Sequence, residues 1–115
     1  EIKVECNYSN LFEMIDRASL LTSDRDKNTI KLELNNDELT ISSNSPEIGY
    51  VEEKMAVKSN GNISISFSSK YMLDAIRSFG EEKVILYMNN DNSPIIVKSN
   101  EETSLIQLVL PIKTY

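Results

Sequence analysis

A loose internal repeat constrains the fold of this chain more than any other sequence feature. A strand-like apolar alternation is followed by a helical pattern with a Met-aliphatic-Asp core, and both recur in the second half. The corresponding segments are residues 2–6 with 63–67, 14–16 with 72–74, 35–37 with 89–91, and 43–44 with 99–100. Their order and spacing agree, so each half predicts one strand, one helix and three further strands. We therefore expect an α+β fold: a duplicated βαβββ unit (about 1–58 and 59–115) in one domain, with two antiparallel sheets and two helices on one side.

Two periodicities place the individual elements. A two-residue alternation predicts strands over residues 2–6, 30–34, 39–41, 51–57, 63–67, 84–88, 94–98 and 104–112. Helical spacing predicts a helix over 9–22, opened by a capping box of Asn10 and Glu13, and a second helix from Ser68 or Ser69 to Gly80. We interpret both apolar stripes as core packing. Asn60-Gly61 predicts a hairpin turn between the strands on either side of it.

The composition argues against an enzyme. The 115 residues include no histidine, the commonest general base and metal ligand, and a single cysteine, which fits a reducing cytosol. The glutamate doublets at 52–53, 81–82 and 101–102 place neighbouring carboxylates on opposite faces wherever they lie in strands. The three glycines are scattered and form no phosphate-binding loop. We expect no catalytic residue, no metal and no cofactor.

Charge and apolar runs leave other questions open. The net charge of −6 opposes tight binding to phosphate backbones, and the helix cations Arg17, Lys70 and Arg77 stand among acids. Such a mixed face is typical of solvated helices as well as of nucleic-acid surfaces. The nearly unbroken apolar run over residues 105–112 is compatible with a buried central strand or with a groove for an apolar peptide, with Pro111 and Ile112 at its rim.

No apolar run approaches the roughly 20 residues of a membrane-spanning helix, so we expect no membrane partner. The chain starts without methionine, inside a strand pattern. We therefore interpret it as a fragment or a processed product.

Four motifs, in order along the chain, resemble one known family. They are residues 15–21, residues 44–47 followed by 51–53, residues 66–75, and residues 108–115. Together they resemble the third domain of the bacterial sliding clamp, the DNA polymerase III beta subunit, and they span essentially the whole chain.

The resemblance implies a non-enzymatic processivity factor. In this family two three-domain chains join head to tail in a ring that encloses duplex DNA and slides on it. Expected partners are duplex DNA, DNA polymerase and repair proteins that carry short linear motifs, the clamp loader, and a second copy of the chain. The expected location is the bacterial cytoplasm, at the nucleoid during replication. The candidate DNA-facing residues are Arg17, Lys70 and Arg77.

The resemblance also implies two protein-binding surfaces. The peptide-binding groove corresponds to Tyr71, Asn92, Pro94, Leu108, Val109, Leu110, Pro111, Ile112 and Lys113. The dimer interface corresponds to Leu20, Leu21, Glu47, Glu52 and Glu53. Leu21 is equally compatible with the core of the domain itself, and Glu53 falls on the face of its strand that also carries Val51 and Met55.

Two alternatives remain at this point. One is a protein-interaction domain without a role on DNA, and the other is a hydrolase domain that uses surface carboxylates, such as a glycan hydrolase. The coarse fold separates the hydrolase from the clamp, since a hydrolase needs a cleft with converging carboxylates whereas a clamp domain needs both helices on one side.

Overall fold

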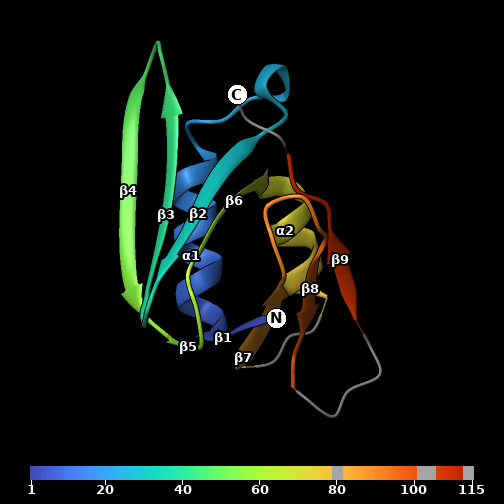
Figure 1. Cartoon of the computed structure of the whole chain (residues 1–115). Helices are drawn as coiled ribbons and strands as arrows, with labels where there is room; N and C mark the ends of the chain where they lie inside the picture. Colours follow the sequence, from blue (N-terminus) through green and yellow to red (C-terminus); the bar gives the residue numbers. More distant parts are fainter. Residues whose placement is uncertain (79–81, 101–105, 113–115) are drawn as a thin grey trace.

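The structure, a computed structural model, describes residues 1–78, 82–100 and 106–112 (Figure 1). Its elements, in chain order, are β1 (Ile2–Asn7), α1 (Tyr8–Ser19), the 3-10 turn η1 (Asp24–Asp26), β2 (Thr29–Asn35), β3 (Glu38–Ser45), β4 (Gly49–Ala56), β5 (Lys58–Ser59), β6 (Ile63–Ser68), α2 (Ser69–Arg77), β7 (Lys83–Met88), β8 (Ile95–Lys98) and β9 (Gln107–Val109). The predicted Glu101-Glu102 doublet, Phe79, Gly80 and Lys113 lie outside the described residues.

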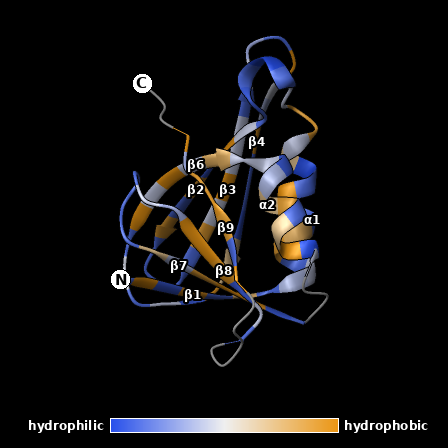
Figure 2. Ribbon diagram, turned by 90° about the vertical axis from the view of Figure 1, so that its right-hand side faces the viewer, coloured by the Kyte–Doolittle hydropathy of each residue, from blue (hydrophilic) through white to orange (hydrophobic). Residues whose placement is uncertain are grey.

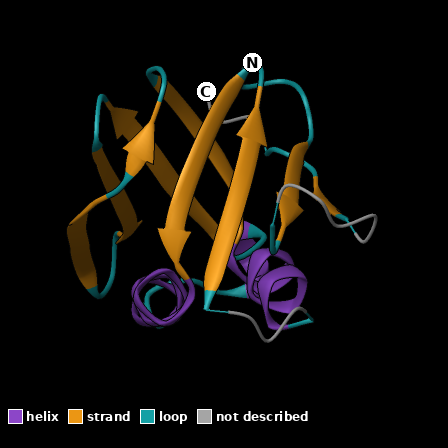
Figure 3. Cartoon of the chain, turned by 90° about the horizontal axis from the view of Figure 1, so that it is seen from below, coloured by secondary structure: helices purple, strands orange, loops and turns teal. Residues whose placement is uncertain are grey.

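Two antiparallel sheets form the body of the domain. One has the strand order β5-β1-β7-β8-β9 and the other has the order β4-β3-β2-β6. The strand that opens each half of the chain pairs with the other half: β1 lies beside β7, and β6 lies beside β2. Both helices lie on one side of the sheets (Figure 3). The predicted α+β fold is confirmed.

Each helix starts directly at the end of a strand. The side chain of Asn7 caps α1 by accepting a hydrogen bond from the backbone N–H of Asn10 at 3.0 Å, and Ser68 accepts one from Tyr71 at 3.3 Å. The predicted capping box at Asn10 and Glu13 was wrong. Helix α1 begins earlier because β1 runs into it without a loop, and the backbone N–H of Tyr8 donates to the carbonyl of Glu82 at 2.7 Å. The Ser68 cap was predicted correctly.

The core lies between the two sheets and beneath the helices. Hydrophobic residues alternate with hydrophilic ones along the strands, and both helices lie to one side of the sheets (Figure 2). Val4, Leu32, Phe67 and Leu86 are completely buried, one from each of four strands of the two sheets. Among the described residues, every buried side-chain nitrogen or oxygen has a hydrogen-bond partner. The alternating pattern therefore places the hydrophobic core where the sequence predicts it.

The predicted hairpin at Asn60-Gly61 was wrong. Strand β5 pairs with β1 in the five-stranded sheet, whereas β6 pairs with β2 in the other sheet. The side chain of Asn60 explains the difference: its carbonyl oxygen accepts from the backbone N–H of Lys3 at 2.7 Å, and its amide donates to the carbonyl of Glu1 at 3.2 Å. A Cβ on Gly61 would lie 3.0 Å from the side chain of Ile2. The turn thus carries the chain from one sheet to the other.

The last described strand, β9, lies at the edge of its sheet, which excludes the buried central strand. Beyond β9 the chain crosses to the other sheet. Pro111 lies opposite Phe67 of β6, and the backbone N–H of Ile112 donates to the carbonyl of Ser66 at 2.8 Å. The end of the described chain therefore ties the two sheets together.

Within the described ranges, no helix is both long enough and apolar enough to cross a membrane.

Candidate functional site

The first candidate site is a groove between α2 and the chain end, with a volume of about 570 Å³, which we call the C-terminal groove. It is lined by Asp24, Lys27, Asn28, Ser68, Lys70, Tyr71, Leu108, Val109, Leu110, Pro111 and Ile112. Three of its large apolar side chains are exposed: Leu108 (58%), Leu110 (68%) and Tyr71 (67%). Val109, in contrast, is buried and anchors the segment in the core.

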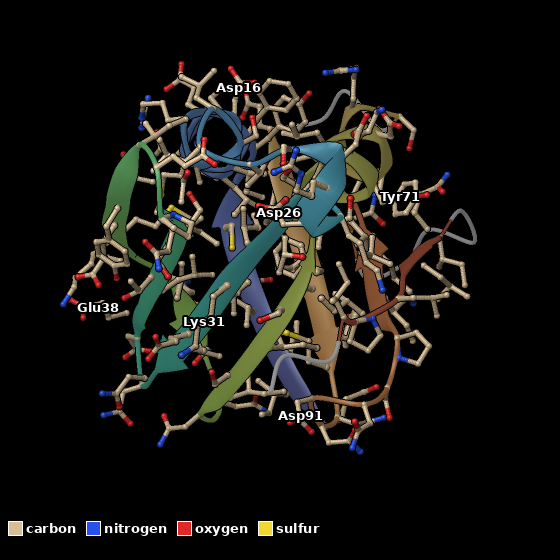
Figure 4. The ribbon with its side chains drawn as sticks, turned by 90° about the horizontal axis from the view of Figure 1, so that it is seen from above. Asp16, Asp26, Lys31, Glu38, Tyr71 and Asp91 are labelled. Atoms are coloured by element: carbon tan, nitrogen blue, oxygen red, sulfur yellow. The ribbon has the colours of Figure 1, made fainter. Side chains whose placement is uncertain are left out.

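The groove gathers most of the residues that the sequence predicts for it. Tyr71 and the five residues from Leu108 to Ile112 all line it. Asn92 and Pro94 do not, because they belong to the turn between β7 and β8, where the backbone N–H of Asn92 donates to the side chain of Asn90 at 2.8 Å. Asp91, in the same turn, lies far from Tyr71 (Figure 4).

Sequence reasoning missed the loop that forms another wall of the groove. Asp24, Lys27 and Asn28 come from η1 and the turn after it, where Lys27 and Asn28 adopt φ angles of 61° and 53°. The carbonyl of Asn28 accepts from the backbone N–H of Ser69 at 2.8 Å, which joins this loop to the start of α2. The polar composition of residues 23–28 indicates a loop, but nothing in it indicates a neighbour some forty residues away.

The groove combines apolar anchors with an open strand edge. Within the described residues β9 pairs only with β8, so its other side leaves backbone groups without a strand partner. Exposed aliphatic and aromatic side chains next to such an edge suit an extended peptide with apolar side chains. The geometry thus supports recognition by burial and backbone hydrogen bonds rather than by charge.

The second candidate site is the β4 edge, which we define as Leu20, Ile48, Tyr50, Glu52 and the backbone of β4. Strand β4 pairs with β3 along its whole length and has no partner strand on its other side within the described part of the chain. Leu20, Ile48 and Tyr50 are 76%, 69% and 61% exposed. The hydroxyl of Tyr50 donates to the carboxylate of Glu52 at 2.6 Å, and this bond raises the pKa of Tyr50.

The structure brings together most of the predicted interface residues at this edge. Glu52 lies on the outer face of β4, and Glu47 is exposed in the turn before the strand. Leu21 is half-buried, which is compatible both with the predicted dimer interface and with the core of the domain. Glu53 is turned inwards, on the same face of β4 as Val51 and Met55.

An ion pair joins α1 to the β4 edge. The guanidinium of Arg17 binds both carboxylate oxygens of Glu53: Nε lies 2.6 Å from Oε2 and Nη2 lies 2.6 Å from Oε1. The hydrogen bond from Arg17 lowers the pKa of Glu53 and, reciprocally, raises that of Arg17. Two residues that the sequence assigns to different surfaces are thus partners.

The other predicted helix cations also have close neighbours. Arg77 lies 3.6 Å from the carboxylate of Asp74, and its guanidinium carbon is 5.3 Å from the ring centre of Phe12. Lys70 is exposed and belongs to the C-terminal groove. Among the residues that the structure describes, no group of three or more histidine, cysteine, aspartate or glutamate side chains could hold a metal ion.

Comparison of structures defines the class of protein as a sliding-clamp domain. The fold superposes on the DNA polymerase sliding clamp from Bacillus subtilis with a TM-score of 0.94 and 34% identity, covering 100% of this chain and 31% of that one. It also superposes on the DNA polymerase III subunit beta from Pseudomonas aeruginosa with a TM-score of 0.92 and 29% identity, covering 98% of this chain and 31% of that one.

Sequence comparison gives the family. The model of the DNA polymerase III beta subunit, C-terminal domain, matches residues 1–113. The beta sliding clamp of Staphylococcus epidermidis is 41% identical over 117 residues, which cover 100% of this chain and 31% of that protein. The chain belongs to the DNA polymerase III beta subunit family, in its C-terminal domain, and spans about a third of the length of the curated relatives it matches.

Proposed function

We propose that this chain is the third domain of a bacterial sliding clamp, an accessory processivity factor that leaves catalysis to other chains. Family membership supports this proposal, because the matching family model is that of the C-terminal domain. We propose further that the domain consists of two pseudo-repeats that meet near residues 58 and 59. The strand pairing supports this division: β1, which opens the first half, pairs with β7 of the second half, and β6, which opens the second half, pairs with β2 of the first.

In the proposed assembly, two chains join head to tail and enclose duplex DNA. The helices face the duplex, and Arg17, Lys70 and Arg77 are their candidate cations. A domain with a net charge of −6 makes few strong phosphate contacts. Loose contact of this kind suits a ring that holds DNA by enclosure and slides along it, loaded by a clamp loader in the bacterial cytoplasm.

The C-terminal groove is the proposed docking site for short linear motifs of DNA polymerase and repair proteins. The observation that carries this proposal is the exposed apolar set of Tyr71, Leu108 and Leu110 beside the open edge of β9. An extended peptide would place apolar side chains between α2 and the chain end and pair its backbone with β9. Asn92, Pro94 and Lys113 complete the proposed residue set from the family resemblance.

The β4 edge is the proposed head-to-tail junction. Exposed Leu20 and half-buried Leu21 supply apolar contact, and Glu47, Glu52 and Glu53 supply negative charge for a basic partner edge.

Peptide titration tests the docking proposal. A peptide that carries a clamp-binding motif of a polymerase is added to the full-length protein, and binding is followed by fluorescence anisotropy. We expect saturable binding that Leu110→Asp weakens about a hundredfold, because a carboxylate replaces an apolar anchor. Leu20→Asp, at a similarly exposed leucine on the β4 edge, is the matched control and should change peptide binding little. Binding that is insensitive to Leu110→Asp would contradict the groove, and no binding at all would contradict the docking role.

A further inference from the structure

The pair between Arg17 and Glu53 is partly exposed, like the other ion pairs of this sheet, but it differs from them in geometry. Two guanidinium nitrogens of Arg17 each lie 2.6 Å from a different carboxylate oxygen of Glu53. The two residues are 36 positions apart in the sequence and belong to different elements. Lys31 and Glu33, on the same sheet, are 3.4 Å apart, and Lys54 and Glu38 are 3.8 Å apart. A bidentate arginine–carboxylate pair fixes orientation as well as distance. This pair therefore defines how α1 lies against β4.

Glu53 occupies an unusual place for a carboxylate. It lies opposite Ile41 of β3 and shares its face of the strand with Val51 and Met55, towards α1. An inward charge on an edge strand discourages indiscriminate pairing with other sheets, but it needs a partner to remain there. Arg17 is that partner, and each oxygen of Glu53 already accepts a short hydrogen bond from it.

Arg17 is also connected to the exposed end of its own helix. Its backbone carbonyl accepts a hydrogen bond from the N–H of Leu20 at 3.2 Å, and Leu20 is the most exposed large apolar residue of the β4 edge. A contact from β3 also holds this end of α1: the hydroxyl of Ser43 donates to the carbonyl of Ala18 at 2.7 Å. The helix end is thus held by β3 through Ser43 and by β4 through Arg17.

We propose that Arg17 is a positioning residue of the head-to-tail junction, which fixes α1 against β4 through Glu53 and so holds Leu20 beside the edge, rather than a DNA contact. The inference rests on the proposed function, in which the β4 edge is the junction. It reassigns two residues. Glu53 acts within its own domain, and Glu52 and Glu47 are left to meet the cations of a partner edge.

The test measures the dissociation constant of the ring without DNA, by analytical ultracentrifugation of the full-length protein. Arg17→Ala and Glu53→Ala should each raise this constant about tenfold. An exposed ion pair changes one contact about threefold, and a ring of two chains contains two such junctions.

The exchanged pair, Arg17→Glu with Glu53→Arg, separates the proposal from its rival. If the pair acts within the domain, the exchange restores the dissociation constant to near the wild-type value. If Glu53 binds a cation of the partner instead, the exchange places an arginine against that cation and weakens the ring beyond either single variant. That second result would overturn the proposal. Arg17→Lys keeps the positive charge but loses the bidentate geometry. Its dissociation constant should therefore lie between those of the wild type and Arg17→Ala.

Two controls keep the outcomes distinct. Arg77→Ala removes a helix arginine that pairs with Asp74 away from β4, and it should leave the dissociation constant unchanged. Leu20→Asp should dissociate the ring. If it does not, the β4 edge is not the junction and the proposed function fails. If Leu20→Asp dissociates the ring while Arg17→Ala leaves its dissociation constant unchanged, the positioning role alone is refuted.

Discussion

Two of the edge strands in the described part of the domain, β4 and β9, are protected in opposite ways. Strand β4 is eight residues long, carries an inward glutamate neutralised from α1, and exposes Tyr50 and Glu52 on its outer face. Strand β9 has only three residues, of which Leu108 is exposed, and it is followed by exposed Leu110 and then by Pro111. The long strand β4 thus avoids indiscriminate pairing through its charges. The short strand β9 avoids it because it offers few backbone groups and ends near a proline. The comparison shows that one domain can limit unspecific strand pairing at two edges by different means. The residues that do so also determine which kind of partner each edge can accept.

The two edges are also far apart. Strands β4 and β9 lie on opposite sides of the domain in Figure 1, and Figure 4 shows Glu38, which pairs with the end of β4, across the molecule from Tyr71. Substitutions at sites so separated usually act independently. The predictions below use this separation.

The largest effects should come from removing the core support of each edge. Phe67 lies opposite Pro111 near the C-terminal groove, and Leu39 lies opposite Met55 of β4; both are completely buried. We expect Phe67→Ala to lower the free energy of unfolding by about 3–5 kcal/mol and Leu39→Ala by about 2–5 kcal/mol, measured by denaturant unfolding.

Amide exchange distinguishes the two core variants. The N–H of Ile112, bound to Ser66, reports on the groove, and the N–H of Val57, bound to the carbonyl of Asp37 at 2.8 Å, reports on the end of β4. Phe67→Ala should accelerate exchange mainly at Ile112, and Leu39→Ala mainly at Val57. Equal acceleration at both amides in both variants would show that the edges share one support.

A crossed pair of surface variants should separate the functions of the edges. Leu110→Asp should weaken peptide binding about a hundredfold and leave the dissociation constant of the ring unchanged, and Leu20→Asp should do the reverse. Both residues are more than two-thirds exposed, so folding should be unaffected. Anisotropy and ultracentrifugation of the full-length protein give the two readouts. A variant that impairs both functions would refute independent edges.

Cys6, which is buried on β1 of the five-stranded sheet, should make the stability of the domain sensitive to alkaline pH. Burial raises its pKa from 9.0 to about 12. Between these values an unfolded chain releases a proton that the native state retains, so the free energy of unfolding should fall by about 1.4 kcal/mol per pH unit above pH 9. Unfolding of this domain at pH 8, 9 and 10 measures the slope. The Cys6→Ala variant should show a shallower one, and equal slopes would contradict the assignment.

The smallest effect should be acid sensitivity confined to the β4 edge. Arg17 lowers the pKa of Glu53 below its ordinary 4.5, so the stabilisation is complete above pH 4.5 and is lost as the pH falls through the lower native pKa. The dissociation constant of the ring, measured from pH 5 downwards, should increase up to about tenfold more in the wild type than in Glu53→Gln, because protonation removes the pair at both junctions. Identical profiles would show that this carboxylate does not contribute.

Local sequence patterns predicted the elements better than their partners. The two-residue alternation located the long strands, and Ser68 marked the start of α2, because burial and capping depend on residues close in sequence. The prediction of a hairpin at Asn60-Gly61 failed because the side chain of Asn60 accepts a hydrogen bond from Lys3 of β1. Lys3 lies 57 residues earlier in the chain, so no local pattern contains this contact.

The same limit applies to the sites. The apolar run over residues 105–112 left a buried central strand and a groove equally open, because a sequence shows that residues are apolar but not whether they are exposed; the groove was predicted only from the family resemblance. The pairing of Arg17 with Glu53 could not be predicted, because it depends on how α1 lies over β4. The loop around Asn28 joined the groove for a similar reason, through one backbone hydrogen bond to Ser69.

The first strand of each half pairs with a strand of the other half, and this has a consequence for the order of folding. Strands β2, β3 and β4 follow one another and can pair as soon as they emerge during synthesis. Strand β1 must wait for β7, because Val4 pairs with Leu86 more than eighty residues further along. Such non-local pairing slows folding, and until β7 arrives an apolar strand stays without its main partner. Within this domain, the strand that is synthesised before the others is therefore among the last to gain its main partner.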